Sequence, residues 1–372
     1  MLQNDTTIPN QTAADVIRPL IISDSRTIQR FYSPLRHLLF GFEAQDIPCC
    51  IVVPPDSQIE LNFWPGIEII EYPTWRFPLF YRQNRLRLLS QVERFKPTIV
   101  HCFGTATAPL AKAVGCTFNI PVVLTANSAG QSLLRRWRIR DSFSAVITPS
   151  SRIAELFKNR NPRIAPLVRQ INTGTFVDET CACFSRSGQI PSMIVVSDFL
   201  RFDDLEPFLN AIRHLVIDGY EFLVVLMGDG PAEEDIRKFI HAVGLANTVN
   251  ISPQMRPLRA VFRGADIFVQ PCVTERFDPA MLEAAGAGIA IVADKSNADD
   301  FLLNNVTAVL FDNRDELSIY SALQKFLDDR EFAKSTASAA QNHLRGSHSV
   351  SAMVDNLLAI YSQAASAFFA SH

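Results

Sequence analysis

The sequence lacks the features that mark membrane-spanning and exported proteins. No stretch reaches about 18 uninterrupted apolar residues, so we expect no membrane-spanning helix. The start of the chain, Met-Leu-Gln-Asn-Asp-Thr-Thr, is polar and lacks the basic and apolar regions of a secretory signal. The 7 cysteines are odd in number and show no framework spacing, which favours a reducing compartment. We therefore expect a cytoplasmic protein, with any membrane contact peripheral and at the inner face.

A metal site is not expected either. Cys181-Ala-Cys183 is the one Cys-x-Cys spacing, and no second Cys or His cluster completes the four ligands of a structural zinc site. We interpret the two side chains as loop thiols.

The chain is too long for one hydrophobic core. Compact domains usually hold about 100–200 residues, whereas this chain has 372. Its 48% hydrophobic and 20% charged residues are typical of a folded protein with a large core. Charge is uneven, because residues 1–180 hold 20 Lys and Arg against 14 Asp and Glu, while the remainder holds 15 against 24. The pattern predicts two domains, a basic one followed by an acidic one.

Short β-rich apolar runs alternate with helical stretches in both halves. The first half contains expected strands at 19–23, 49–53, 66–70, 98–101, 121–125 and 145–148, and helices at 35–44, 82–95, 106–116 and 131–138. The second half contains expected strands at 193–197, 222–227, 247–251, 266–269, 289–293 and 308–311, and helices at 205–216, 232–243, 258–263, 279–287 and 316–327. The alternation predicts an α/β protein with two doubly wound parallel sheets.

A Cys-, Ser- and Gly-rich break at 180–189 separates the two series. We assign residues 1–180 to a first Rossmann-like domain and 190–345 to a second. Residues 347–372 are expected to form a helix that packs back across both. Ligands of open α/β sheets bind outside the carboxyl ends of the strands, so we expect the function in a cleft between the two sheets.

Two basic segments with aromatic residues lie in the first half. They contain Trp75, Phe77, Phe80, Tyr81, Arg82, Arg85, Arg87, Arg94 and Lys96, and then Arg135, Arg136, Trp137, Arg138 and Arg140. An anionic membrane surface would bind such helices, and a solvated helix face, the simpler interpretation of each segment taken alone, has the same pattern. Nucleic acid would attract the same charges, but no recognition motif accompanies them, so no nucleic-acid partner is expected.

The most informative motif carries two carboxylates on a strand–turn–helix. Ala265-Asp-Ile-Phe-Val-Gln-Pro ends a strand, and Glu275-Arg-Phe-Asp-Pro-Ala-Met-Leu-Glu leads into the next helix. Such a turn aims backbone N–H groups and the positive end of the helix dipole at the cleft, where a diphosphate would fit. Glu275 can accept hydrogen bonds from sugar hydroxyls, and Glu283, two turns along, from a ribose diol. Without further context, the simpler interpretation is that Glu275 is a helix cap and Glu283 a surface residue of the helix.

A second motif, Val224-Val-Leu-Met-Gly-Asp-Gly-Pro, runs a strand into a glycine turn. With Gly244-Leu245, Val249-Asn-Ile-Ser-Pro-Gln254 and Ala265-Asp266 at their observed spacing, it resembles the donor domain of family 4 glycosyltransferases. The resemblance covers nearly the whole chain and is strongest from Met193 to about Asn342. Weaker matches in the first half are Ile99-Val-His101 with Gly104, Pro121-Val-Val-Leu-Thr125, Ala145-Val-Ile-Thr-Pro-Ser150 and Ile171-Asn-Thr-Gly174.

The resemblance implies a GT-B fold, with the acceptor on the side of the first domain and a nucleotide sugar on the second. It implies transfer with retention of anomeric configuration and no required metal or other cofactor. Glu275 would contact the donor sugar, Glu283 the ribose, and the amides near Phe277 and Asp278 the diphosphate. The segment Ser252–Arg256 would border the base. The donor-binding candidates are Glu283, Phe277, Asp278, Pro279, Gly228, Met255, Arg256, Asn127 and His101, and the catalytic candidates are Glu275 and Arg201.

The phosphate-binding loop departs from the family pattern. Members carry Gly-Arg and a Lys five residues after the Arg, whereas this chain has Asp198 and Asp203 at those positions. Anions beside a diphosphate are unfavourable, and Arg201 in the same loop is the candidate replacement. The loop Asp24–Ile28 also lacks the usual glycine pair, although Arg26 supplies a positive charge.

Further departures occur around the expected cleft. Asn127 stands where many members have a His, Asp278 replaces a common Gly, and Lys295–Asp300 lacks a glycine pair. His101 is retained, although a lone His at a strand end is more often structural than catalytic.

Three hypotheses follow. The first is a retaining glycosyltransferase that moves a sugar from a UDP- or GDP-sugar to a glycan or lipid-linked acceptor in cell-surface polysaccharide or glycolipid synthesis. The second is a catalytically degenerate pseudo-glycosyltransferase that acts as a binding or partner subunit, which the acidic Asp198 and Asp203 motivate. The third, a GT-B epimerase of nucleotide sugars, has no specific motif in its favour.

Overall fold

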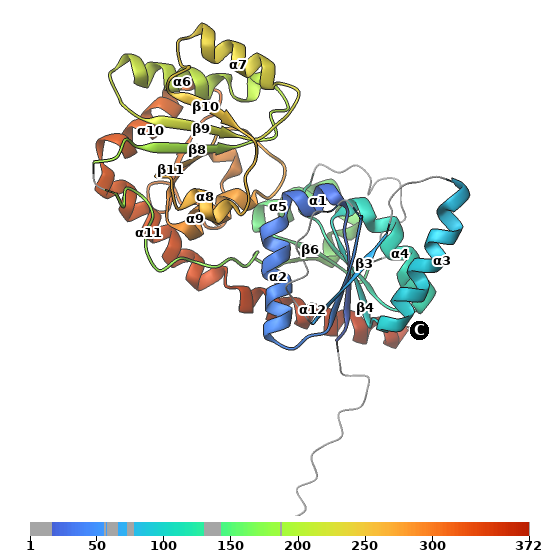
Figure 1. The fold of residues 1–372 in the computed structure, drawn as a ribbon. Helices are drawn as coiled ribbons and strands as arrows, with labels where there is room; N and C mark the ends of the chain where they lie inside the picture. Colours follow the sequence, from blue (N-terminus) through green and yellow to red (C-terminus); the bar gives the residue numbers. More distant parts are fainter. Residues whose placement is uncertain are drawn as a thin grey trace, which may run out of the picture.

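The protein folds into two α/β lobes (Figure 1). The structure is a computed structural model that describes residues 17–55, 57, 66–72, 78–129, 143–186 and 188–371. The expected helix at 131–138, the second basic segment, and Trp75 and Phe77 of the first lie outside the described residues. Within the described ranges, no helix is both long enough and apolar enough to cross a membrane.

The first lobe is built on a 7-stranded sheet with the order β3-β2-β1-β4-β5-β6-β7. All neighbouring strands are parallel. The strands are β1 (Pro19–Ile22), β2 (Cys49–Val53), β3 (Ile67–Glu71), β4 (Ile99–Phe103), β5 (Val122–Thr125), β6 (Ala145–Thr148) and β7 (Val168–Gln170). Strands β1, β2, β4, β5 and β6 are buried along their whole length, as expected for a parallel sheet with both faces covered.

Five helices of the first lobe are described: α1 (Ser25–Arg30), α2 (Tyr32–Ala44), α3 (Pro78–Phe95), α4 (Ala108–Phe118) and α5 (Ser151–Arg160), with short 3-10 turns at Thr105–Thr107 and Pro162–Leu167. The sequence interpretation did not anticipate α1, α5 or β7. Both helices begin at a side-chain cap, since Asp24 accepts from the Thr27 amide and Ser150 from the Ile153 amide. Arg87 and Arg94 of α3, and Lys96 directly after this helix, are exposed.

The second lobe is built on a 6-stranded parallel sheet with the order β10-β9-β8-β11-β12-β13. Its strands are β8 (Ser192–Val196), β9 (Leu223–Met227), β10 (Val249–Ser252), β11 (Ile267–Gln270), β12 (Ala290–Asp294) and β13 (Val309–Phe311). Its helices are α6 (Glu206–Ile217), α7 (Glu233–Ala242), α8 (Leu258–Phe262), α9 (Pro279–Ala287) and α10 (Glu316–Asp328), with 3-10 turns at Phe202–Asp204 and Lys295–Asn297. The predicted α/β class with two doubly wound parallel sheets is confirmed.

Two long helices return the chain from the second lobe to the first (Figure 1). α11 (Arg330–Ser347) packs against α9 and β12, and α12 (Val350–Ser371) packs against α2 and β5. The approach of α12 to α2 is close, because a Cβ atom on Gly41 would lie 2.5 Å from Val354 Cγ2. α11 was not anticipated. The boundaries set at residues 180, 190 and 345 stay predictions.

A buried hydrogen-bond chain fixes α12 to the first sheet. Tyr361 and His101 are each 1% exposed, and the Tyr361 hydroxyl lies 2.6 Å from His101 Nδ1. The other ring nitrogen, Nε2, lies 2.6 Å from Thr125 Oγ1. Burial lowers the pKa of His101 to about 3, so the ring is neutral at physiological pH.

We predict that Tyr361→Phe destabilises the fold by about 1–3 kcal/mol, because it leaves His101 Nδ1 buried without a partner. Urea denaturation followed by circular dichroism measures the change. Tyr320→Phe is the matched control, since its hydroxyl bonds Asp218 at the surface and its loss should cost less than about 0.5 kcal/mol. Equal effects of the two substitutions would contradict a stabilising role for the buried pair.

Candidate active site

The two lobes meet through their main chains at the carboxyl ends of their sheets. Residues 127–129 follow β5, and residues 275–277 precede α9. Ala129 N–H donates to Glu275 O and Phe277 N–H donates to Asn127 O, both at 3.0 Å, so Ser128 and Arg276 form an antiparallel bridge. We call this contact the backbone seam. It brings together three of the predicted site residues, Asn127, Glu275 and Phe277.

Arginines of α5 hold the Glu275 side of the seam. Arg160 pairs with the Glu275 carboxylate through both terminal nitrogens, with 2.6 Å between Nη1 and Oε2. This hydrogen-bonded pairing lowers the pKa of Glu275, so the half-exposed carboxylate is ionised at neutral pH. Arg152 donates to the carbonyls of Thr274 at 2.9 Å and Arg276 at 2.8 Å. Sequence reasoning missed both arginines, although Ser150 after a strand is a helix-start signal that places them at the cleft.

The start of α9 is already hydrogen-bonded. Asp278 caps the helix, since its Oδ1 accepts from the Ala280 amide at 2.9 Å, and Gln270 donates to its other oxygen. Burial raises the pKa of Asp278. Phe277 and Pro279 are buried, and the Phe277 amide is used in the seam. A diphosphate bound by these amides would replace the hydrogen bond from Phe277 to Asn127. Diphosphate binding by Phe277, Asp278 and Pro279 stays a prediction.

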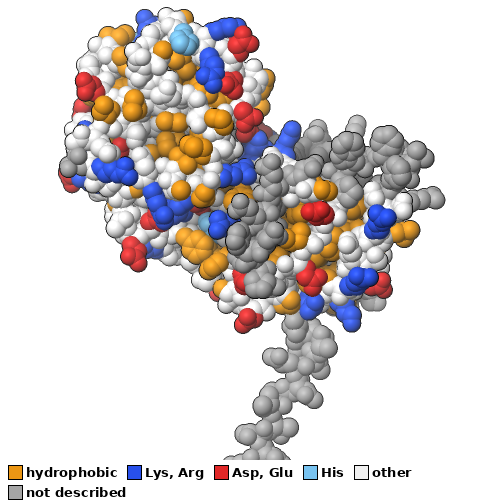
Figure 2. Space-filling view, viewed as in Figure 1, with side chains coloured by type: hydrophobic (Ala, Val, Ile, Leu, Met, Phe, Trp, Pro, Cys, Tyr) orange, Lys and Arg blue, Asp and Glu red, His pale blue; other side chains and the backbone are white. Residues whose placement is uncertain are grey.

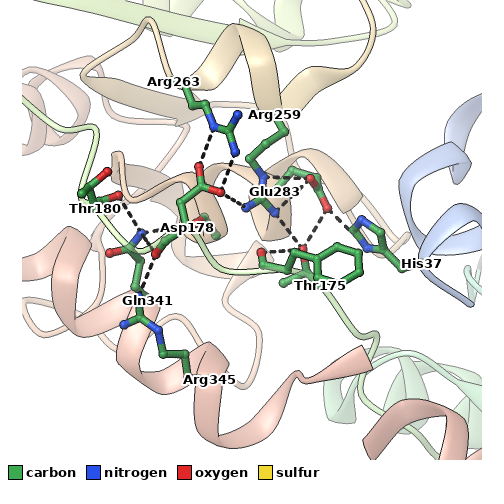
Figure 3. A network of polar contacts seen from close by, with 11 residues as sticks. His37, Thr175, Asp178, Thr180, Arg259, Arg263, Glu283, Gln341 and Arg345 are labelled. Atoms are coloured by element: carbon green, nitrogen blue, oxygen red, sulfur yellow. Dashed lines mark hydrogen bonds and ion pairs between the residues drawn. The ribbon is translucent and has the colours of Figure 1, made fainter. Parts of the chain in front are cut away.

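Glu283 lies inside a polar network that joins both lobes (Figure 3). It is 3% exposed, accepts from Thr175 Oγ1 at 2.9 Å, and accepts from Arg259 Nε at 3.1 Å. Arg259 also lies 3.5 Å from Asp178, whose pKa is lowered mainly by its hydrogen bonds from Arg263. Each Glu283 oxygen therefore already has a partner, and a ribose diol would share or replace one of these contacts.

His37 of α2 approaches the same carboxylate without forming an ion pair. Its Nδ1 lies 3.8 Å from Glu283 Oε1 but only 3.1 Å from the Gly174 carbonyl. Burial is the largest influence on the ring and lowers the pKa of His37, so we assign it as neutral with Nδ1–H donating to Gly174.

The loop after β8 carries Asp198 in an ion-pair cluster. Arg30 of α1 and Arg276 both bind Asp198 Oδ2, the latter at 3.2 Å. The catalytic candidate Arg201 instead pairs with Asp204 in its own turn, and its side chain is 71% exposed. The cations that bind this loop are therefore Arg30 and Arg276. Sequence reasoning did not select either of them, although Arg276 directly follows Glu275 in the strand–turn–helix motif.

The remaining donor-binding candidates are Gly228, Met255 and Arg256, of which Arg256 contacts α1 and α2. Gly228 has φ 155°, and a Cβ atom there would fall 1.8 Å from the Ser197 carbonyl, so glycine is required for the loops to approach. Arg256 donates to the Gln29 carbonyl and stacks 5.4 Å from the centre of the Tyr32 ring. Met255 is 46% exposed.

A cavity of about 50 Å³ lies beside the seam in the first lobe. Most of its wall is apolar, with Phe31, Leu38 and Met353 among the lining residues, and His101 and Asn127 also face it. Asn127 is 8% exposed and its Nδ2 has no hydrogen-bond partner. The site thus offers a buried amide donor at the wall of an apolar cavity.

Comparison with known proteins finds a glycosyltransferase family model on each lobe. The family model described as "Glycosyltransferase Family 4" matches residues 35–175, and the model "Glycosyl transferases group 1" matches residues 191–329. The structure of Anabaena HepE in complex with UDP-glucose superposes with a TM-score of 0.76 and 14% identity over 93% of this chain and 99% of that one. The predicted GT-B fold is confirmed by such neighbours.

Two curated relatives are similar in sequence. Sulfoquinovosyl transferase SQD2 of Arabidopsis thaliana is 21% identical over 282 residues, which are 68% of this chain and 54% of the relative. The GDP-mannose-dependent alpha-(1-6)-phosphatidylinositol monomannoside mannosyltransferase of Mycobacterium tuberculosis is 30% identical over 169 residues, which are 42% of this chain and 43% of the relative. The matched segments span about half the length of these relatives.

A second polar contact between the lobes lies after β12. Asp300 accepts from the Ser151 amide at 3.1 Å and from Gln170 Nε2 at 2.7 Å. Asp299 beside it is 8% exposed and accepts from Ser150. Burial raises the pKa of Asp299 to about 6, which the nearby Arg152 opposes and Asp300 reinforces.

We predict that Asp299 makes stability fall as pH rises from about 4 to above 6. The raised pKa means that the folded state keeps the proton longer than the unfolded chain, so this stabilisation is complete at acid pH and is lost on ionisation. Asp299→Asn should remove that decline, and the stability of the variant relative to the parent should rise by about 2 kcal/mol between pH 4.5 and 7.5. Urea denaturation at both pH values measures it.

Asp312→Asn is the control for this comparison. Its hydrogen bond from Lys295 lowers the pKa of Asp312, so its carboxylate is ionised across most of the same interval. A pH-independent effect of Asp299→Asn would show that the Asp299 carboxyl group does not titrate in this range.

Proposed function

Since the chain belongs to the group 1 and family 4 glycosyltransferases, we propose that it transfers a sugar from a UDP- or GDP-sugar to a glycan or lipid-linked acceptor with retention of anomeric configuration. The reaction would serve cell-surface polysaccharide or glycolipid synthesis at the cytoplasmic face of a membrane. The observation that carries the proposal is the placement of Glu275 and the start of α9 at the carboxyl ends of two facing parallel sheets, where α/β folds bind their ligands.

Names of similar proteins support the substrate class. The Anabaena neighbour is described in complex with UDP-glucose, and the mycobacterial relative is named as GDP-mannose-dependent and specific for a phosphatidylinositol monomannoside. A nucleoside diphosphate sugar is therefore the proposed donor.

In the proposed reaction the acceptor hydroxyl attacks the anomeric carbon on the face from which the diphosphate departs. The new bond joins the acceptor oxygen to that carbon, the bond from the carbon to the diphosphate oxygen breaks, and the departing diphosphate takes the hydroxyl proton. Glu275 would accept hydrogen bonds from the sugar hydroxyls and hold the ring for attack. Closure of the lobes would exclude water, which limits hydrolysis of the donor. No metal is part of this proposal, so protein cations would compensate the charge of the leaving group.

A second candidate function is a pseudo-glycosyltransferase that binds a partner, a glycan or a nucleotide without turnover. Two observations favour it. Asp198 stands where the resemblance implies an Arg, and the Phe277 amide expected at the diphosphate donates to Asn127 instead. The two candidates differ in whether a bound donor is consumed.

Calorimetric titration with UDP, GDP and ADP, followed by their sugar conjugates, tests the proposal. We expect UDP or GDP, or one of their sugars, to bind with a dissociation constant below about 1 mM, the upper end of typical enzyme KM values. If a nucleotide sugar binds but no free UDP or GDP is released in the presence of any acceptor, the pseudo-enzyme is selected. No binding of any nucleotide at millimolar concentration would refute the transferase.

We predict that Glu275→Gln lowers kcat for transfer by about 100-fold or more, since an amide offers one acceptor oxygen in place of the two of a carboxylate and loses its charge. Release of UDP or GDP in a coupled assay measures the rate. Arg160→Gln is the matched variant, because it breaks the same interlobe ion pair while keeping the carboxylate. An equal loss in both variants would assign the effect to the ion pair and not to contact with the sugar.

A further inference from the structure

Two arginines from opposite lobes converge on one carboxylate oxygen. Arg30 lies at the end of α1 in the first lobe, and Arg276 lies between β11 and α9 in the second. Both bind Oδ2 of Asp198, at 3.2 Å for Arg276. The three side chains are 29%, 31% and 42% exposed for Arg30, Arg276 and Asp198, so they are reachable from solvent. Figure 2 shows Lys and Arg side chains along the border between the lobes on the face in view.

Positive charge exceeds negative charge in this cluster. One carboxylate binds two guanidinium groups, and Arg26 adds a third cation within electrostatic range of Arg30. Asp278 also lies within electrostatic range of Arg276, but burial raises the pKa of this carboxyl group and disfavours its charged form. Burial, followed by repulsion from Arg276, lowers the pKa of Arg30, and the contact with Asp198 opposes this shift. A ligand with more charge and more acceptor oxygens than one carboxylate would therefore be favoured here. Phosphate oxygens suit arginine well, because the planar fork of the guanidinium can bind two of them at once.

The topology places the same three residues where α/β sheets bind ligands. Strand order reverses at β1 and β4 in the first sheet, and at β8 and β11 in the second. Arg30 follows β1, Asp198 follows β8 and Arg276 follows β11. Each residue therefore comes from the carboxyl end of a strand at a switch point, which is the general position of ligand crevices in such sheets.

Asp198 is fixed by its backbone, whereas the arginines reach it by long side chains. The loop is anchored by Phe199, which is 0% exposed and whose carbonyl accepts from the Ala232 amide at 3.0 Å. Gly230 packs so closely that a Cβ atom there would lie 2.1 Å from the Asp198 carbonyl. Rotation of their side chains therefore allows the two arginines to leave Asp198 and bind an incoming anion, without movement of the loop.

We propose that Arg30 and Arg276 form a phosphate-binding pair that receives the diphosphate of the donor, and that Asp198 occupies the pair until the ligand displaces it. The inference rests on the proposed function for the identity of the ligand. The phosphate-binding cations are thus assigned to α1 and to the motif that carries Glu275 and Glu283, in place of the loop after β8. Arg201 has no part in it.

Calorimetric titration with inorganic pyrophosphate, and with the nucleoside diphosphate that binds the parent protein, tests the pair. Arg30→Gln and Arg276→Gln should each weaken both ligands about tenfold or more, because each removes a charge-assisted contact. Asp198→Asn should strengthen both about tenfold, because it removes the competing anion while keeping the side-chain shape. Arg237→Gln, which breaks an ion pair with Glu233 on α7, is the matched control and should leave both affinities unchanged.

Folding of each variant is checked by thermal unfolding, and Arg30→Lys keeps the charge if Arg30→Gln does not fold. Arg30→Lys should then bind pyrophosphate more weakly than the parent, since an ammonium lacks the guanidinium fork. Parent-like affinity in the Arg30 and Arg276 variants, or no gain in Asp198→Asn, would overturn the inference and leave the transferase standing. No binding of nucleotide or pyrophosphate to the parent and to Asp198→Asn would overturn both.

Discussion

The candidate active site depends on two N–H···O bonds between the lobes, which join the chain beyond β5 to the chain before α9. Both are 3.0 Å long and fix the backbone of Glu275, Arg276 and Phe277. Because that backbone is held, the three side chains leave it in set directions. Glu275 meets Arg160, Arg276 meets Asp198, and Phe277 is buried at the start of α9. The position of each proposed contact to a donor therefore follows from the seam.

Part of the uneven charge of the sequence is used at the border between the lobes. Arginines of the basic first half, Arg30, Arg152 and Arg160, donate across the border to Asp198, to backbone carbonyls and to Glu275. The acidic second half supplies the partners. Exposed ion pairs contribute little each. The apolar cluster that runs through both lobes, where α2 contacts α9, and the buried Glu283 network therefore contribute more to the attachment between the lobes. The ion pairs determine which side chains face the cleft.

Regular periodicity allowed the fold to be predicted, while contacts distant in sequence did not follow from it. The strands are short apolar runs that can be recognised from the local sequence alone. The strand–helix motif likewise allowed Glu275 and Glu283 to be selected as candidates. α11 was missed because much of its buried face is alanine, as at Ala333, Ala337 and Ala340, which gives a weak apolar period. The partners of Asp198 and Glu275 were missed because 168 and 115 residues separate them from Arg30 and Arg160. No local pattern reports such a pair.

The return of α12 to the first lobe has a consequence for biosynthesis. The first sheet is complete once residue 170 has been made, but the partner that covers Gly41 of α2 and bonds His101 lies in residues 350–371. A ribosome therefore makes the entire second lobe before the first can bury this face. Domains usually fold in the order of their synthesis, and an apolar surface left open during that time is a target for chaperones. The nascent first lobe should accordingly be a chaperone client until α12 emerges from the exit tunnel.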